Sequence, residues 1–122
     1  IPYWEAVIHA ARSGQAPSLF IGDFNTGRND LDKAPNGTRF VRADFMDQIT
    51  TSGYVDLWRV RHPEHREYSW FSPQGQNGFR LDHAFGTEAL SQQVLDCRYD
   101  HNVRNEGLSD HSALIVDVDL GE

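Results

Sequence analysis

Residues 18–25 read SLFIGDFN, a short apolar run that ends in a carboxylate and a carboxamide. An apolar run of this length is typical of a buried strand. The polar residues that follow, 23–39, form a long loop, and such loops in compact domains are often functional. In an extended backbone, Asp23 and Asn25 leave the same face, where the carboxylate can accept a proton from water and the amide can orient it. A plain turn is the alternative, because Asp and Asn are favoured in turns.

A second polar group lies within residues 79–85, FRLDHAF, whose alternation predicts a strand. The alternation places Asp82 on the face opposite the apolar Leu81. A surface ion pair between Arg80 and Asp82 is the alternative interpretation. His83 falls on the apolar face, where we expect a hydrogen-bonded core histidine.

The third polar group, SDHS at 109–112, lies directly before SALIVDVDL at 112–120, which alternates strongly enough to predict a strand. Asp110 beside His111 in a loop that enters a strand could supply a metal ligand together with a general acid or electrophile. The alternative is again structural, because Ser and Asp also satisfy the backbone groups of turns.

The rest of the chain mixes helical and extended patterns, with most strands in its second half. The predicted helices are 4–11, ended by Gly14, and 40–51, ended by Gly53; further predicted strands are 67–71 and 94–100, and 55–60 is open between helix and strand. The chain of 122 residues is long enough for one domain with a modest core.

The composition excludes some classes of protein. With 39% apolar and 24% charged residues the chain is expected to be globular, and it has no apolar run near the ~20 residues of a membrane span. The net charge of −7 counts against binding DNA mainly by neutralising phosphates, although a bound cation could offset it locally. Cys97 is the single cysteine, so we expect a core thiol and a reducing, cytoplasmic setting.

Taken in order, GDFN, YSWFSP, GFRLDH and SDHSALIV resemble the C-terminal half of the endonuclease/exonuclease/phosphatase family, and most of all its bacterial exonuclease III-like members. The resemblance implies an α+β fold that is half of a four-layer α/β/β/α sandwich. In that half, one mixed, mostly antiparallel sheet is flanked by helices. Residues 1–122 would then form a single, partial domain of this family.

The resemblance also implies roles for individual residues. Asp23 would orient or deprotonate the attacking water, and Asn25 would hold the water or the developing phosphorane oxygen. His111 would bind the scissile phosphate, and Asp82 would fix and charge its imidazole. Asp110 would contact Mg²⁺ or Mn²⁺, the ions that suit an oxygen-rich site.

Two residues of the FRLDH motif, Phe79 and Arg80, would contact the substrate, with Phe79 as the aromatic that faces nucleic acid. Trp70 matches a strand aromatic of the same region and is expected to be core. The family's N-terminal half supplies a metal-ligand Glu that this sequence lacks. We therefore expect incomplete metal binding and an uncovered inner sheet face that includes Val116 and Val118 or their strand neighbours. We also expect pairing in a homodimer or with a missing N-terminal half.

Three functions remain open from the sequence. The leading one is a divalent-metal phosphodiesterase, a DNA endo- or exonuclease of exonuclease III type, with activity weak or absent in this chain alone. The acidic charge favours a second, a phosphoesterase of the same family that acts on small molecules. The absent Glu favours a third, a non-catalytic dimeric or binding half-domain.

Overall fold

The structure is a computed structural model that describes residues 2–14 and 16–121. The helices are α1 (Pro2–Ser13), α2 (Asp44–Thr51), α3 (Glu88–Ser91) and α4 (Asn102–Asn105). The strands are β1 (Leu19–Asp23), β2 (Tyr54–Asp56), β3 (Trp70–Phe71), β4 (Gly78–Phe79), β5 (Asp82–Thr87), β6 (Val94–Asp100) and β7 (Ala113–Val118). The α+β class expected from the sequence is confirmed, and among the described residues no helix is long and apolar enough to cross a membrane.

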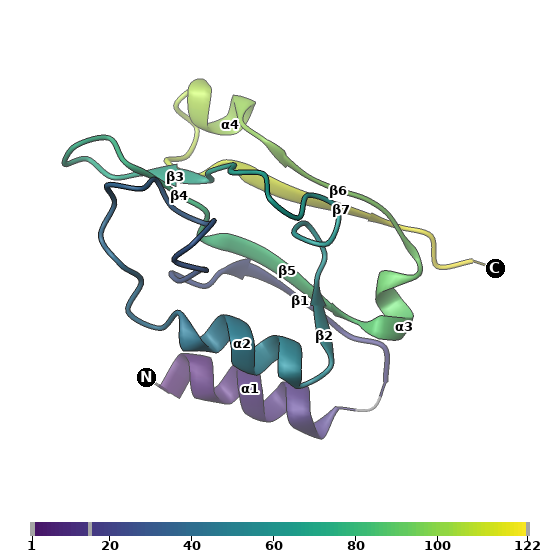
Figure 1. Cartoon of the computed structure of the whole chain (residues 1–122). Helices are drawn as coiled ribbons and strands as arrows, with labels where there is room; N and C mark the ends of the chain where they lie inside the picture. Colours follow the sequence, from purple (N-terminus) through teal and green to yellow (C-terminus); the bar gives the residue numbers. More distant parts are fainter. Residues whose placement is uncertain (1, 15, 122) are drawn as a thin grey trace.

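The elements stack in layers. Helices α1 and α2 lie side by side against one face of a sheet with the order β1-β5-β2, and the β6–β7 pair lies on the other side of that sheet (Figure 1). The expectation of one sheet is wrong, because β3–β4 and β6–β7 each form a separate antiparallel pair. The described strands therefore form three sheets, of which the β1-β5-β2 sheet and the β6–β7 pair are stacked.

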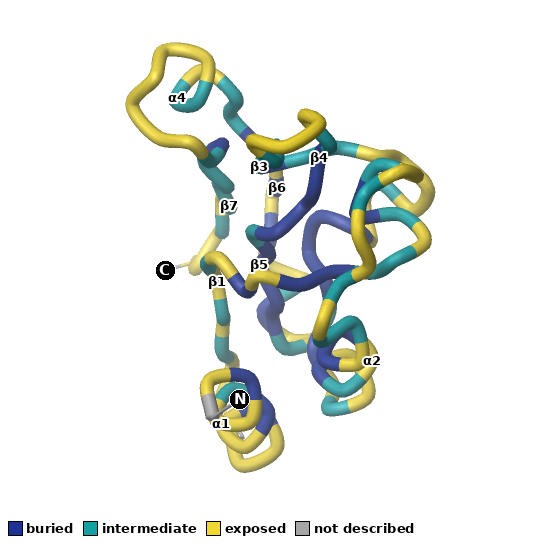
Figure 2. Tube along the Cα trace, turned by 90° about the vertical axis from the view of Figure 1, so that its left-hand side faces the viewer, coloured by how far each residue is buried: buried dark blue, intermediate teal, exposed yellow. Residues whose placement is uncertain are grey.

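Two hydrophobic cores explain this stacking. The alternating side chains of β5 reach both cores, with Phe85 among the helix residues and Ala84 among those of β6. Figure 2 shows β5 dark blue over most of its length. The expectation that Val116 and Val118 lack a partner is wrong, because both pack against the second core.

Strand β1 is the least covered strand of the central sheet. It is an edge strand, which among the described residues pairs with β5 alone. Phe20 packs toward the helices, whereas Leu19 and Ile21, on the opposite face, are 37% and 48% exposed. The two strands β6 and β7 are too few to cover that face of β1.

The predicted strand over 79–85 is interrupted at Arg80 and Leu81, which lie between β4 and β5. The backbone N–H of Arg80 donates to the carbonyl of Asp32 at 2.7 Å, next to an isolated antiparallel bridge between Lys33 and Phe79 rather than within β5. The Arg80 side chain turns inward and is fully buried, so the surface ion pair with Asp82 considered above does not form. A single buried side chain thus sets the break in the strand.

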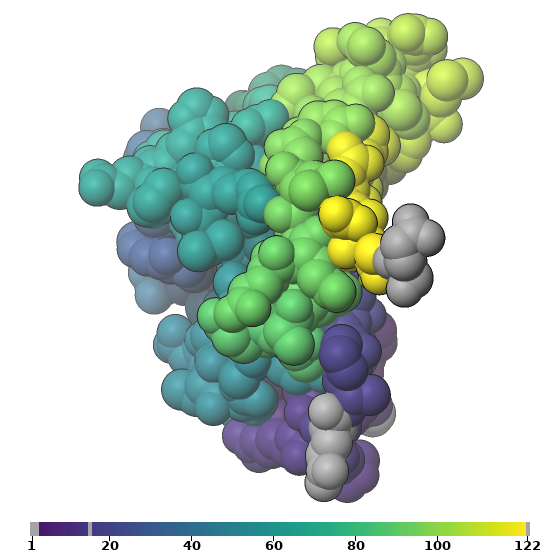
Figure 3. Space-filling view, turned by 90° about the vertical axis from the view of Figure 1, so that its right-hand side faces the viewer, coloured from purple at the N-terminus to yellow at the C-terminus, as the bar shows by residue number. Residues whose placement is uncertain are grey.

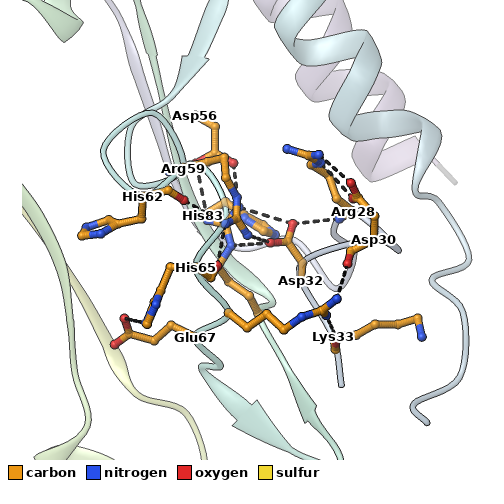
Figure 4. A network of polar contacts seen from close by, with 12 residues as sticks. Arg28, Asp30, Asp32, Lys33, Asp56, Arg59, His62, His65, Glu67 and His83 are labelled. Carbon is orange, nitrogen blue, oxygen red and sulfur yellow. Dashed lines mark hydrogen bonds and ion pairs between the residues drawn. The ribbon is translucent and has the colours of Figure 1, made fainter. Parts of the chain in front are cut away.

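A network of buried charges surrounds Arg80. Its guanidinium bonds to Asp32 at 2.8 Å and to Asp56 at 2.7 Å. Arg59 also pairs with Asp32 (Figure 4). Burial alone would raise the pKa of Asp32, but the charge and hydrogen bonds of Arg80 outweigh it and lower that pKa to about 2. The carboxylate is therefore held ionised in the interior.

The structure tests three further predictions, which concern the start of α2, the burial of His83 and the burial of Cys97. The helix predicted from residue 40 begins only at Asp44, since the Phe40 N–H is held by the Asn29 side chain at 2.8 Å. His83 is a buried histidine whose Nε2 lies 2.6 Å from the carbonyl of Thr26, as predicted. Cys97 is buried, which raises the pKa of its thiol to about 12 and confirms it as a core residue.

The structure also tests the first predicted helix, the strand predicted over 67–71 and the segment 55–60. Trp4, Ile8 and Ala11 form the buried stripe of α1, as their spacing predicts. The strand predicted over 67–71 is shorter, limited to β3, and the ambiguous segment 55–60 begins within β2 and continues as a turn.

We predict that Arg80→Met strongly destabilises the fold, because it leaves two buried carboxylates without their main partner. Loss of one member of a buried ion pair costs about 3–5 kcal/mol. Urea unfolding measures the effect. Arg98→Met is the matched control, because Arg98 bridges Asp96 and Asp117 on the exposed surface and its loss should change little. Equal unfolding midpoints for the two variants would contradict this prediction.

Candidate active site

The polar groups singled out in the sequence meet at one end of the central sheet. Asp23 ends β1 and Asp82 begins β5, and the two residues face each other across the antiparallel ladder. His111 lies in the loop before β7. One ligand atom from each of the three residues lies within 4.8 Å of the others. Figure 3 faces the opposite end of the molecule, where green α3 and β6 and the yellow end of β7 lie beside purple N-terminal and teal middle parts of the chain.

The imidazole of His111 is oriented by Asp82. Its Nδ1 lies 2.7 Å from Asp82 Oδ2, while its Nε2 lies 3.7 Å from Asp23 Oδ2. Partial burial acts to lower the pKa of His111, but the hydrogen bond and charge of Asp82, with the charges of Asp23 and Asp110, outweigh it and raise that pKa. The geometry favours an imidazolium whose Nε2–H lies near the carboxylate of Asp23.

Asp23 and Asn25 lie close together, but not through the extended backbone expected from the sequence. Asn25 has φ of +52°, a left-handed conformation that Asn tolerates, and its N–H donates to Asp23 Oδ1 at 2.9 Å. Burial raises the pKa of Asp23, the Asn25 hydrogen bond opposes that shift, and the charge of Asp82 adds to it. A turn at Asp23 and Asn25 is therefore compatible with a role of both residues in binding and activating water.

Asp110 lies at the rim of this group. Its Oδ1 is 4.0 Å from His111 Nε2, and its side chain is 81% exposed. The carboxylates of Asp23 and Asp110 thus both lie within 4.0 Å of His111 Nε2. A donor set rich in carboxylate oxygen fits a hard divalent cation such as Mg²⁺ or Mn²⁺.

A cleft of about 560 Å³ opens beside His111. Its lining combines apolar rings with polar groups: Asn25, Asn36, Thr38, Arg39, Phe40, Val41, Trp70, Ser72, Gln74, Asn77, Phe79, Leu81 and His111. Phe79 is placed here as the sequence suggests, although it is largely buried. Arg80 is not, because its side chain lies in the buried charge network and does not reach the cleft.

Sequence reasoning missed part of this lining. Trp70, expected in the core, is only half-buried and its ring centroid lies 6.5 Å from that of His111. Arg39 adds a positive charge from the long loop after β1. The length of that loop was the only signal for Arg39.

The fold and this group of residues define an α+β protein with a carboxylate–imidazole site at the ends of antiparallel strands, next to an aromatic cleft. The chain belongs to the Endonuclease/Exonuclease/phosphatase family, whose model matches residues 2–111.

Among curated proteins, the chain is similar to an exodeoxyribonuclease of Streptococcus pneumoniae. The two are 23% identical over 121 residues, which cover 87% of this chain and 42% of the relative. The chain thus spans less than half the length of that relative.

Two solved structures show the same fold. A 3′-5′ exonuclease from Neisseria meningitidis superimposes with a TM-score of 0.81 at 24% identity, covering 97% of this chain and 52% of that one. An AP endonuclease from Archaeoglobus fulgidus gives 0.82 at 24% identity, covering 98% and 53%. This chain corresponds to about half of each of these folds.

We predict that Asp82→Asn lowers the pKa of His111 toward its ordinary value of about 6.5, because the neutral amide no longer stabilises the imidazolium. A raised pKa in the folded state stabilises the fold below about pH 6.5, and this contribution is lost as the pH rises through the folded pKa. NMR titration of the His111 ring protons in EDTA measures the shift. Asp117→Asn, an exposed change on β7, is the control, and an unchanged pKa in Asp82→Asn would refute the prediction.

Proposed function

We propose that this chain carries the proton-transfer and phosphate-binding part of a divalent-metal phosphodiesterase that acts on DNA, of exonuclease III type. The observation that carries the proposal is the Asp82–His111 hydrogen bond with Asp23 opposite the free Nε2. The aromatic cleft beside it supports a substrate that presents flat rings or sugars next to a phosphodiester.

The reaction follows from the positions of these groups. Asp23, an ionised carboxylate with a raised pKa, accepts the proton of a water molecule that Asn25 orients. The water oxygen forms a bond to phosphorus, and the bond from phosphorus to the leaving alkoxide breaks. The His111 imidazolium donates a hydrogen bond to a non-bridging oxygen, where negative charge develops. A divalent cation at Asp23 and Asp110 would add further positive charge beside the phosphate.

Two alternatives are each favoured by one observation. The net charge of −7 favours a small phosphoester, whose binding needs few phosphate contacts. The exposure of Asp110, whose side chain is 81% exposed, favours weak metal binding and thus a non-catalytic half-domain. The substrates below separate the three functions.

We predict that the chain cleaves abasic-site duplex DNA weakly when Mg²⁺ or Mn²⁺ is present, and that Asp23→Asn lowers kcat by at least about 10²-fold because it removes the base. Cleavage of this duplex, of linear duplex and of bis(p-nitrophenyl) phosphate is measured with and without EDTA. Glu88→Gln is the control, because Glu88 is exposed on α3 at the other end of β5.

Each outcome points to one function. Cleavage of bis(p-nitrophenyl) phosphate alone would favour the small phosphoester, and calorimetry without metal binding would favour the non-catalytic half-domain. Cleavage that resists EDTA, or that persists in Asp23→Asn, would contradict the proposed mechanism.

We propose that further β-structure of the same family domain, from the rest of a longer protein or from a second copy, covers the exposed face of β1. Leu19 and Ile21 leave apolar surface open on that face. The unpaired edge of β1 also offers backbone groups to an incoming strand.

We predict that the isolated chain therefore self-associates at micromolar concentration and that Ile21→Lys shifts it toward monomer. Sedimentation velocity measures the distribution. Leu95→Lys serves as the matched control, because Leu95 is exposed on β6, away from β1. A monomeric, thermally stable chain at that concentration would rule out the association.

A further inference from the structure

We infer that Ser69 is the positioning residue of the Asp82–His111 pair, through which both sides of that pair are held at hydrogen-bonding distance. The inference deepens the proposed function of this site and rests on it. Ser69 directly precedes the two-residue strand β3 and is fully buried. Its place in the sequence alone does not explain this burial. Its hydrogen bonds show what the burial achieves.

The Ser69 hydroxyl fixes the backbone of Asp82. Its Oγ accepts the N–H of Leu81 at 2.9 Å and the N–H of Asp82 at 3.3 Å. These residues lie where the chain leaves β4 and enters β5. The hydroxyl therefore takes the place of the neighbouring strand that would otherwise accept these two protons.

The backbone of Ser69 fixes the His111 side of the pair. Its carbonyl accepts the N–H of Ser112, the residue after His111, at 2.8 Å. Ser112 is itself buried, and its Oγ lies 2.6 Å from His101 Nδ1 and accepts the N–H of Arg104 Nε at 3.1 Å. The loop that carries His111 is therefore anchored through Ser69 on one side and through His101 on the other.

One buried residue thus connects the two segments whose side chains form the 2.7 Å bond between His111 Nδ1 and Asp82 Oδ2. The Tyr99 hydroxyl, which donates to the Asp82 carbonyl at 2.5 Å, holds the opposite side of the same peptide segment. Without the Ser69 Oγ, two buried N–H groups lose their acceptor, and the backbone must move to find another. Asp82 moves with it and the imidazole loses its orientation.

The test is the NMR signal of the His111 Nδ1–H proton in the whole chain at low temperature. A proton shared with a carboxylate resonates downfield of the amide protons, and its absence in His111→Gln assigns it. We expect the signal to be lost in Ser69→Ala and retained in Ser69→Thr, which keeps the hydroxyl. In Ser69→Cys, whose sulfur is a weaker acceptor, it should shift or broaden, and this variant serves if Ser69→Ala does not fold.

The matched control is Thr87→Val at the other end of β5. The Thr87 hydroxyl also accepts two backbone N–H groups, from Ser18 and Leu90. This variant should lose stability without losing the His111 signal. A signal that persists in Ser69→Ala, that disappears equally in Thr87→Val, or that is absent from the unmodified chain overturns the inference.

Enzyme kinetics give an independent readout. Displacing a catalytic group by about 1 Å can cost about 10²-fold in rate, so Ser69→Ala should lower kcat with little change in KM. Ser69→Thr should restore kcat, which a general loss of stability would not explain. If the chain cleaves no phosphodiester, the proposed function fails, whereas the proton signal still decides the role of Ser69.

Discussion

The charge of Arg80 constrains the whole centre of this molecule, because a buried guanidinium is tolerated only where carboxylates surround it. Asp32 comes from the loop after β1 and Asp56 from the end of β2, so the ion pairs join segments that share no strand ladder. The long polar loop is thereby tied to the interior at its midpoint. That anchor makes an irregular segment part of the scaffold.

The same constraint shapes the site. Turning Arg80 inward interrupts the strand, and β5 starts afresh at Asp82, directly opposite Asp23. Arg80 also donates to the Tyr99 hydroxyl at 3.3 Å, and Tyr99 in turn bonds the Asp82 carbonyl. A residue that no substrate touches therefore helps to set the geometry of the residues that one would meet.

The sequence was informative where polar residues follow apolar strands. The order of the three motifs predicted that Asp23, Asp82 and His111 belong to one site, where the structure places them. The mixture of helical and strand patterns predicted the α+β class. The alternation assigned Arg80 to one face of the strand predicted over 79–85, but it could not show that β6 and β7 cover that face. Asp32 gave no signal, since one Asp in a loop full of polar residues is unremarkable without its distant partner. Ser69 was hidden in the same way, because its partners come from other segments.

The pairing of β1 with β5 brings Asp23 and Asp82 together from opposite halves of the sequence. Closing so long a loop costs conformational entropy before any contact forms, and contacts between distant residues slow folding. The β6–β7 pair, whose connection is short and contains α4, can form earlier. A refolding chain is therefore expected to bring Asp23 and Asp82 together late, after the more local β6–β7 pair can form.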